Sequence, residues 1–513
     1  MILASSQSKT TQDESDQDLK TFSKNKKFRV ALVCDWLTVV GGAEQVLREI
    51  HQIFPTAPIY TSQYRPKGID WFKDAEVKTG YLNFFPAFTR RFIAPLRQAY
   101  FKHLDLTGYD LVISVSGCDA KYVKTKPGVH FCYCHVPTQY YWGKSIEYQK
   151  DPGFGPLNFL VRPIFKLLLP RLRKKDLEAA ARPDYYITIS EFAKSEIKKF
   201  YKREAKVIYP PVNTEKFSEV VKYKDIKQGN YQILEQHQNQ KNQMNQKTYD
   251  TIENNKSQIE QKNYHTIKST YSQAQPESGH NIKSSSRQCV TVENYVKSII
   301  SPAQNGYFIN FSRQVSWKRL DLAILACIKE KQPLVLIGDG PEHQNLARLA
   351  ATHPDLITLL STMPQSELKE YLKNAKAFIF PSEEPFGIAP VEALAAGCPV
   401  IAFSKGGAKD YILDKKNGVF FDHQSVNSLV AAIKKFNYLY YETENLEDGN
   451  NKKTVSQEHI SHSSLLSPLE ISKTAEKFST HHFKEQLEEY LARTISSTKV
   501  QFQQKHTNQE RQS

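Results

Sequence analysis

Two long stretches of the chain contain short apolar runs that recur between more polar segments. The runs are rich in Val, Ile and Phe and stay apolar at consecutive positions, which is typical of strands buried on both faces. The first stretch, 28–215, is predicted to contain strands at 28–34, 111–116, 130–134, 185–189 and 206–211. The second stretch, 305–440, is predicted to contain strands at 307–312, 334–340, 356–360, 377–382, 399–404 and 418–422.

Amphipathic segments with helical spacing separate most of these strands. Clear examples are residues 43–54, 191–201 and 321–330. Strands that alternate with helices predict parallel sheets covered by helices on both faces. We therefore expect an α/β protein with two Rossmann-like parallel-sheet domains facing a cleft, and ligands bound at the carboxyl ends of the strands in that cleft.

Polar segments flank and interrupt the two stretches. Within 231–250, six Gln and three Asn occupy nine of twenty positions, which leaves too little apolar surface to form a core. We predict a disordered arm at 1–27 and a low-complexity insert or linker at 218–304. A second polar insert is predicted at 442–470, and a disordered tail at 494–513. The folded parts are then an N-terminal domain at 28–217 and a C-terminal domain at 305–441. A final helix at 471–493 is expected to cross back to the first domain.

The composition argues against several classes of protein. The chain has 513 residues, with 69 Lys and Arg against 54 Asp and Glu, and a net charge of +15. No uninterrupted apolar run reaches the ~18 residues of a membrane-spanning helix. The opening Met-Ile-Leu-Ala is too short for a signal-peptide core, so we expect a cytoplasmic protein.

The cysteines do not suggest a disulfide scaffold or a metal site. Seven cysteines are scattered over the chain, and Cys132 and Cys134 lack the spacing of a zinc-ligand pair. Cysteines in or beside apolar runs are typical small core residues, and this applies to Cys34, Cys132, Cys134, Cys327 and Cys398. We therefore expect no zinc site, and no cofactor of any other kind is expected.

The second stretch holds the strongest candidate site. Arg313 and Lys318 follow the predicted strand 307–312, and a helix is expected to open near Asp321. Two cations just past a strand end and before a helix start can converge on one anion, with Arg as a planar fork and Lys as a point charge. A solvated basic turn explains the same spacing equally well.

A second candidate loop follows the predicted strand 377–382. Pro385 and Gly387 shape a loop that exposes backbone N–H groups, and a helix is expected to start near Ile388. Glu384 lies in this loop, and Glu392 lies on an apolar helix where a lone carboxylate favours a functional role. Carboxylates suit sugar and ribose hydroxyls because they accept two hydrogen bonds. A solvated surface charge is an equal alternative for Glu384.

The first stretch offers weaker candidates. Gly41 and Gly42 precede a predicted helix and would let a ligand approach the backbone, although they do not form a dinucleotide-binding GxGxxG motif. His135 follows the strand 130–134, where it can contact a sugar hydroxyl. An ordinary tight turn and a structural histidine are the corresponding alternatives.

Two basic, apolar segments suggest an interface with a membrane. Residues 81–104 combine aromatic residues with basic ones, including Arg97, and residues 154–175 combine Leu, Ile and Phe with six Lys and Arg. Such surfaces attract anionic lipid headgroups, by ~1 kcal/mol per basic residue near the surface. Two core-facing helices with solvated charges are the alternative. No nucleic-acid motif accompanies the positive charge, so we expect no nucleic-acid partner.

Several motifs together resemble the family 4 retaining glycosyltransferases, which have the GT-B fold. They are FSRQVSWKRLDLAI with its Arg-x4-Lys, VLIGDGPE, FPSEEPFGIAPVEALAAGCPVIA with its Glu-x7-Glu, GGAEQVL and CYCHVPTQYYW. The resemblance covers roughly 28–217, 305–440 and 474–493. It implies an N-terminal acceptor domain, a C-terminal nucleotide-sugar domain and transfer with retention of the anomeric configuration.

The resemblance also implies roles for the candidate residues. Arg313 and Lys318 would hold the donor diphosphate and supply the charge that a metal supplies elsewhere. Glu392 would bind the donor ribose, and Glu384 would orient the hydroxyls of the donor sugar as a catalytic residue. The backbone N–H groups that would assist Glu384 belong to Phe386, Gly387 and Ile388.

The opposite wall of the cleft receives roles from the same resemblance. His135 would lie near the sugar as a second catalytic residue. Gly41 and Gly42 would line the phosphate and acceptor side. Asp339 and Gly340 would lie near the base pocket, although the sequence 360–364, Leu-Ser-Thr-Met-Pro, departs from the glycine-containing loop usual in the family.

The CYCH-x-P pattern resembles a subgroup of mannosyltransferases that use GDP-mannose in polysaccharide or lipid-linked glycan synthesis. We therefore expect a hexosyltransferase, with mannose from GDP-mannose as the first candidate donor and a lipid-linked or glycan acceptor. Two alternatives remain at this stage. One is a glycosyltransferase that uses a UDP-sugar, and the other is a non-catalytic module that binds a membrane or a protein.

Overall fold

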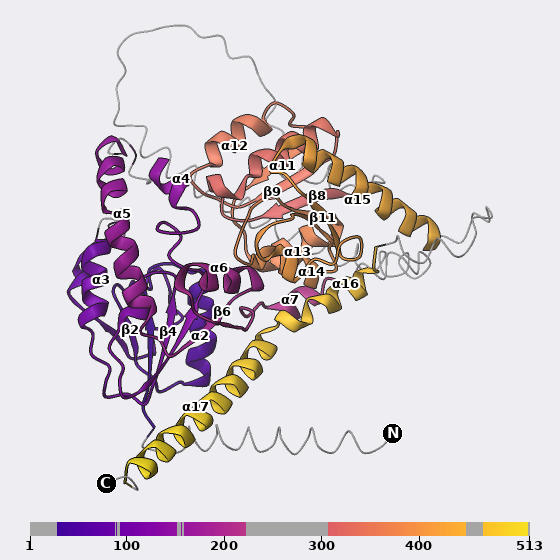
Figure 1. The fold of residues 1–513 in the computed structure, drawn as a ribbon. Helices are drawn as coiled ribbons and strands as arrows, with labels where there is room; N and C mark the ends of the chain where they lie inside the picture. The colour runs from indigo at the N-terminus through magenta and orange to yellow at the C-terminus, as the bar shows by residue number, and fades with distance from the viewer. Residues whose placement is uncertain are drawn as a thin grey trace, which may run out of the picture. The chain divides into compact units, whose positions relative to one another are not determined.

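The computed structural model describes residues 28–87, 89, 93–150, 155, 158–221, 306–447 and 465–510. The predicted arm 1–27 and most of the two predicted inserts, 218–304 and 442–470, lie outside these residues. Within the described residues, two parallel sheets belong to one compact unit (Figure 1). We call the parts built on the first and second sheet, 28–221 and 306–440, the first lobe and the second lobe.

The first lobe is built on a seven-stranded sheet with the order β3-β2-β1-β4-β5-β6-β7, in which all pairs are parallel. Its strands are β1 (Val30–Cys34), β2 (Ile59–Thr61), β3 (Val77–Thr79), β4 (Leu111–Ser116), β5 (Val129–Cys134), β6 (Tyr185–Thr188) and β7 (Lys206–Val207). Its helices are α2 (Gly42–Ile53), α3 (Ala94–His103), α4 (Ser145–Lys150), α5 (Asn158–Ala180), α6 (Glu191–Tyr201) and α7 (Thr214–Ser218), with short 3-10 turns η1 (Tyr81–Phe84) and η3 (Ala120–Tyr122).

The second lobe is built on a six-stranded parallel sheet with the order β10-β9-β8-β11-β12-β13. Its strands are β8 (Tyr307–Phe311), β9 (Leu334–Ile337), β10 (Ile357–Leu360), β11 (Ala375–Phe380), β12 (Val400–Phe403) and β13 (Gly418–Phe421). Its helices are α11 (Leu320–Lys329), α12 (His343–Ala350), α13 (Gln365–Asn374), α14 (Ile388–Ala395) and α15 (Val426–Glu447), with 3-10 turns η6 (Ser316–Lys318) and η7 (Gly406–Asp410).

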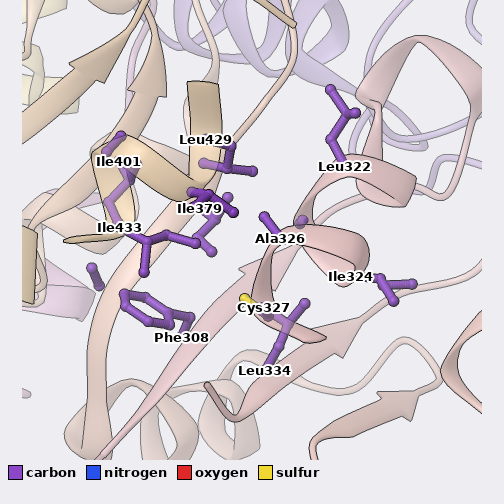
Figure 2. Packing of buried hydrophobic residues seen from close by; sticks show 14 of the residues in the cluster. Phe308, Leu322, Ile324, Ala326, Cys327, Leu334, Ile379, Ile401, Leu429 and Ile433 are labelled. Carbon is purple, nitrogen blue, oxygen red and sulfur yellow. The ribbon is translucent and has the colours of Figure 1, made fainter. Parts of the chain in front are cut away.

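The core of the second lobe explains why its helices lie on the sheet. Helix α11 is apolar on most sides, and its Ala323, Ala326 and Cys327 are fully buried against β8 and β9. Figure 2 shows Phe308, Leu334 and the α15 residue Ile433 in the same cluster. Burial of each large apolar side chain contributes about 1.5–3 kcal/mol.

The C-terminal segment returns to the first lobe. It forms α16 (Pro468–Thr474), the 3-10 turn η9 (Glu476–Phe478) and the long helix α17 (Thr480–Glu510). Helix α17 packs against α2 (Figure 1). At this contact Nζ of Lys484 lies 2.9 Å from Oε2 of the buried Glu49. On β5, the ring of Tyr133 contacts the α17 residue Phe483 edge to face.

The fold class predicted from the sequence is confirmed, and the differences are local. Strands β2 and β3 were not predicted because three residues are too few to show a hydrophobic pattern. Strand β7 ends at Val207 rather than 211, because Pro210 and Pro211 cannot donate to a sheet.

Two further differences concern helix ends. Helix α17 runs on to Glu510, so the prediction of a disordered tail from 494 is wrong; residues 494–510 contain no Pro or Gly that would end a helix. Helix α15 likewise extends to Glu447, past the predicted boundary at 441. The six described cysteines are free and buried, which confirms the five that were predicted as core residues.

Candidate functional site

Both sheets reverse their strand order at a point where charged loops emerge. In the first sheet this point lies between β1 and β4, and in the second between β8 and β11. Parallel sheets bind ligands in the crevice at such a point, at the carboxyl ends of the strands. Residues 35–42 follow β1, Arg313 follows β8 and Glu384 follows β11, so the predicted candidates lie at these two points.

Lys318 and Glu384 form the most direct contact between predicted site residues. Nζ of Lys318 lies 2.5 Å from Oε1 of Glu384, and both side chains are mostly shielded from solvent. The hydroxyl of Ser382 donates a 2.6 Å hydrogen bond to the same carboxylate oxygen. The structure therefore brings the cation of the first loop and the carboxylate of the second loop together. An incoming anion would compete with Glu384 for this lysine.

The loop that carries Glu384 has its backbone fixed by two glycines that the sequence analysis missed. The N–H of Gly407 donates to the carbonyl of Glu384 at 2.8 Å. A Cβ atom at Gly406 would lie 2.3 Å from the Glu384 carbonyl oxygen, and one at Gly407 would lie 2.3 Å from that of Pro385. Only glycine allows this backbone contact. The pair Gly-Gly after the strand 399–404 was the available signal.

Phe386 and Gly387 turn the loop into α14. The Phe386 side chain is buried in an aromatic cluster with Tyr209, Tyr411 and Phe478, and the hydroxyl of Tyr411 donates to the Phe386 carbonyl at 2.9 Å. Gly387 precedes the helix with φ of +100°, a conformation that side chains disfavour. As at the start of any α-helix, the first N–H groups of α14 have no acceptor within the helix.

Glu392 lies on α14, the helix that follows the loop of Glu384. Its carboxylate is partly buried and has no hydrogen-bond or ion-pair partner among the residues that the structure describes. Burial raises the pKa of Glu392 to about 7. An unpaired carboxylate in a dry setting gains from hydroxyl donors, since hydrogen bonds to the charged form lower its pKa.

Arg313 is exposed, and its guanidinium contacts no acidic partner in the described part of the chain. It lines a cavity of about 440 Å³ whose other lining residues come from the first lobe, among them Asp35, Gly42, Glu44 and His135. The cavity thus combines a free guanidinium from one lobe with the strand ends of the other.

The two glycines of the first lobe occupy different environments. A Cβ atom at Gly42 would lie 3.1 Å from Cδ1 of Ile388, so the first residues of α2 and α14 face each other. Gly41 precedes α2 in extended conformation, and a Cβ atom there would lie 2.8 Å from Oε2 of Glu44. Gly42 therefore allows the close approach of the two lobes, and it lines the cavity. Gly41 does not line the cavity.

His135 also lines the cavity. Its Nε2 atom is buried and has no hydrogen-bond partner within the described residues. Burial lowers the pKa of His135 to about 4, although the nearby Asp35 opposes this shift. The ring is therefore neutral near pH 7 and can exchange a hydrogen bond with a ligand hydroxyl.

Asp35 was missed as an organising residue. Its carboxylate accepts hydrogen bonds from four consecutive backbone N–H groups, those of residues 117–120, at 2.7–3.0 Å. It thereby fixes the turn after β4 that forms part of the cavity wall. An acidic residue directly after the first strand was the only sequence signal for this role.

A buried ion pair positions the segment that follows β5. Nζ of Lys121 lies 2.8 Å from Oδ1 of Asp176, and both side chains are only 2% exposed. The same carboxylate accepts hydrogen bonds from Thr138, Trp142 and Tyr201 at 2.7–3.0 Å. This network was not predicted, and it fixes residues 138–142 beside His135.

Asp339 and Gly340 lie apart from the cavity. The Asp339 carboxylate accepts a hydrogen bond from the N–H of Thr362 at 2.8 Å, which lowers the pKa of Asp339. Gly340 packs on the backbone of Gln314, where a Cβ atom would lie 2.1 Å from the carbonyl oxygen. Both residues therefore connect the ends of β8, β9 and β10. No group of three His, Cys, Asp or Glu that suits a metal ion occurs among the described residues.

Residues 292–448 match the family model described as Glycosyl transferases group 1. Curated relatives include an uncharacterized glycosyltransferase, YqgM, of Bacillus subtilis (28% identical over 25% of this chain and 38% of the relative). A GDP-mannose-dependent phosphatidylinositol monomannoside mannosyltransferase of Mycolicibacterium smegmatis is 30% identical over 24% of this chain and 36% of its own. The chain thus matches only a minor part of the length of these relatives.

Solved structures show the same fold at low identity. HepE of Anabaena in complex with UDP is similar with a TM-score of 0.54 and 14% identity, over 92% of this chain and 100% of that one. Sucrose-phosphate synthase of Thermosynechococcus elongatus has the same TM-score, identity and coverage. The second lobe thus matches the Glycosyl transferases group 1 model, and the chain has the two-sheet GT-B fold.

Proposed function

We propose that this protein is a retaining glycosyltransferase that moves a hexose from a nucleotide sugar to a lipid-linked or glycan acceptor. The observation that carries the proposal is the arrangement around the Lys318–Glu384 ion pair. Arg313 precedes Lys318 in the same loop and is free for an anion, and Glu392, on the helix that follows the Glu384 loop, has a carboxylate free for hydroxyls. A diphosphate that bears a sugar on one side and a ribose on the other matches this set of groups.

In the proposed reaction, the donor diphosphate binds Arg313 and Lys318 and displaces the Glu384 carboxylate. Glu384 then turns to the hydroxyls of the donor sugar, and Glu392 accepts hydrogen bonds from the ribose. The two cations and the free N–H groups of α14 stabilise the charge that develops on the leaving diphosphate. His135 contacts the sugar from the first lobe.

The transfer exchanges one glycosidic bond for another on the same face of the sugar. The bond between the anomeric carbon and the phosphate oxygen breaks, and a bond from that carbon to the acceptor oxygen forms. The acceptor hydroxyl gives its proton to an oxygen of the leaving diphosphate, so no side-chain base is required. Closure of the two lobes assembles these groups around the donor.

GDP-mannose is the first candidate donor, because similar proteins of Mycolicibacterium smegmatis and Mycobacterium tuberculosis are described as GDP-mannose-dependent. A UDP-hexose is the second candidate, because HepE was solved with UDP-glucose. Product analysis with labelled GDP-mannose, UDP-glucose and UDP-galactose, in the presence of a lipid extract, separates the two. If no sugar is either transferred or hydrolysed, the chain is a binding module and the proposed activity is wrong.

A matched pair of arginine variants tests the phosphate role. Arg313→Ala is expected to weaken nucleoside diphosphate binding by ~1.5–3 kcal/mol, about 10- to 150-fold in Kd, because it removes a charge-assisted contact. Arg348→Ala, on the exposed face of α12, serves as the control and leaves Kd unchanged. Equal Kd values for the parent and Arg313→Ala in calorimetry contradict the assignment.

We also propose peripheral contact with an anionic membrane surface through α5. Phe159 is 69% and Leu167 is 75% exposed on this helix, and Leu160 and Ile164 are exposed between them. Exposed Arg162 and Lys166 lie on the same turns. Apolar side chains beside basic ones suit insertion at a headgroup boundary, and the negative cytoplasmic leaflet is the expected location.

The second segment with this pattern contributes less than the sequence predicted. Phe84 is 91% exposed, but Arg97 is buried and forms a 2.7 Å ion pair with Asp119. Arg90 and Arg91 lie outside the described residues. No helix in the described part of the chain meets the length and hydropathy needed to span a bilayer.

The membrane proposal predicts co-sedimentation with vesicles that contain phosphatidylglycerol and release by high salt. Screening weakens the attraction between basic residues and anionic lipid. Replacing both Phe159 and Leu167 with Ser is expected to reduce the bound fraction further. Equal binding to neutral vesicles, or binding that salt does not change, contradicts the electrostatic part of the proposal.

A further inference from the structure

A second cavity, of about 330 Å³, lies beside the first and has no role in the proposed chemistry so far. Val136 and Gln139 line both cavities, so the two spaces adjoin along this segment. The remaining wall of the second cavity comes from residues 142–144, from α6 and from Glu383 and Pro385 of the second lobe. The cavity is therefore formed by both lobes, next to the loop that carries Glu384.

One wall of this second cavity is aromatic and rigid. The rings of Trp142 and Phe200 lie 5.2 Å apart at an angle of 32°, and Phe192 completes the apolar surface. The indole N–H of Trp142 donates to Asp176 at 2.7 Å, which fixes the orientation of the ring. The Arg173 guanidinium lies 5.2 Å from the centroid of the same ring, so the stacked pair and Phe192 offer a ligand an apolar surface rather than an open ring face.

The same lining carries charged groups of both signs, and two of them, Glu196 and Lys199, lie on α6 together with Phe192. Glu196, whose side chain is 16% exposed, lies 3.6 Å from Nζ of Lys199, and Glu383 and Lys144 belong to the same lining. Burial raises the pKa of Glu196; Lys199 opposes this shift, and the negative charge of Glu383 adds to it. The two carboxylates from different lobes are therefore close enough to sense each other.

This lining selects for a neutral, polyhydroxylated ligand. Two carboxylates and two ammonium groups balance in charge, so neither a strong anion nor a strong cation is favoured. Carboxylates accept pairs of hydroxyl hydrogen bonds and ammonium groups donate to hydroxyl oxygens, while the aromatic wall covers the apolar face of a sugar ring. A volume of a few hundred cubic ångströms is the lower range of ligand sites.

We propose that the second cavity binds a sugar unit of the acceptor, and this inference rests on the proposed glycosyl transfer. Glu383 in this cavity is the chain neighbour of Glu384, and Gln139 lies at the boundary with the first cavity. A sugar held against Trp142 and Glu196 thus presents the acceptor chain to the donor site from the side of the first lobe. The cavity would then select acceptors that already carry a sugar.

Position 143 allows a direct test by filling the cavity. Gly143 is exposed, and a Cβ atom there would lie 3.1 Å from Oε2 of Glu196. Gly143→Phe therefore places a ring in the cavity without a backbone clash, and Glu196→Gln removes one carboxylate. Glu204→Gln is the matched control, because Glu204 is exposed just beyond α6 and pairs with Lys198.

The probes are methyl α-D-mannoside and methyl β-D-glucoside. Their binding to the full chain is measured by saturation-transfer NMR, with GDP or UDP also bound. We expect a signal from at least one glycoside in the parent and in Glu204→Gln, and a loss of about tenfold or more in affinity in Gly143→Phe and Glu196→Gln. Nucleotide Kd values are expected to stay unchanged in all three variants.

Two outcomes overturn the inference: no glycoside signal in the parent, or an undiminished signal in Gly143→Phe. Failure of the proposed function is seen separately, as an absence of nucleotide binding and of sugar transfer in the parent. If transfer occurs and the acceptor KM is the same in the parent and Gly143→Phe, the enzyme stands and the subsite is wrong.

Discussion

Replacing Asp176 with Asn tests the network that fixes the cleft segment 138–142. The change keeps the size of the side chain but removes its charge. Lys121 then remains buried without its counterion. Burial opposes an ammonium group, and the Asp176 carboxylate contributes most to keeping the pKa of Lys121 above its ordinary value. Loss of one partner of a buried ion pair typically costs about 3–5 kcal/mol.

The hydrogen bonds of Asp176 support the same magnitude. Trp142, Tyr201 and Thr138 donate to the carboxylate at 2.7, 2.8 and 3.0 Å. Hydrogen bonds to a charged group contribute about 1.5–3 kcal/mol each, but these share one acceptor and do not add. Asn retains one acceptor oxygen. We therefore expect Asp176→Asn to lower the free energy of unfolding of the first lobe by ~3–5 kcal/mol.

Urea unfolding followed by tryptophan fluorescence measures this effect, because Trp142 belongs to the network. The double variant Lys121→Met with Asp176→Asn is the control, since removal of both charges leaves no unpaired ion and is expected to recover part of the loss. A loss below about 1 kcal/mol in Asp176→Asn, or strict additivity in the double variant, would refute the reasoning.

Three further changes have defined outcomes. Glu384→Gln is expected to lower turnover by more than about tenfold while the Kd for nucleoside diphosphate changes little, because it removes a contact to the reacting sugar; equal activity would exclude this role. Burial lowers the pKa of His130 to about 3, from an ordinary value of 6.5, so the unfolded chain takes up the proton first. Stability is therefore expected to fall as the pH drops from about 6.5 toward 3, by about 1.4 kcal/mol per pH unit, and His130→Gln should flatten that slope in pH-dependent urea titrations, whereas replacing the exposed His353 should not. Gly407→Ala places a Cβ atom 2.3 Å from the Pro385 carbonyl oxygen and is expected to cost about 1–3 kcal/mol and to lower turnover; a fully active, equally stable variant would show that the loop tolerates displacement.

The candidate residues of the second lobe had the clearest signals in the sequence. Arg313, Lys318 and Glu384 were proposed because each closely follows a strong apolar strand, and strand ends in a parallel sheet meet at one edge. Glu392 was proposed because it lies on an apolar helix. Their spacing along the chain therefore carries spatial information. This spacing did not indicate that Lys318 and Glu384, which are 66 residues apart, form an ion pair.

The first lobe was less predictable because its site depends on contacts between distant segments. Asp35 accepts from backbone groups more than 80 residues away, and these donors carry no side-chain signal. Arg97 was predicted as a surface cation, but its partner Asp119 draws it into the interior. A buried ion pair looks the same in the sequence as two exposed charges.

The sequence by itself determined the two parallel sheets, the position of the loops at their strand ends and the kinds of side chain those loops carry. These features follow from local hydrophobic runs and from glycines and prolines, whose conformational effects act within a few residues. Only the tertiary structure decided which charges pair, which carboxylates stay free and where the two lobes enclose a cavity. Those outcomes depend on desolvation and on atomic distances between segments that are remote along the chain.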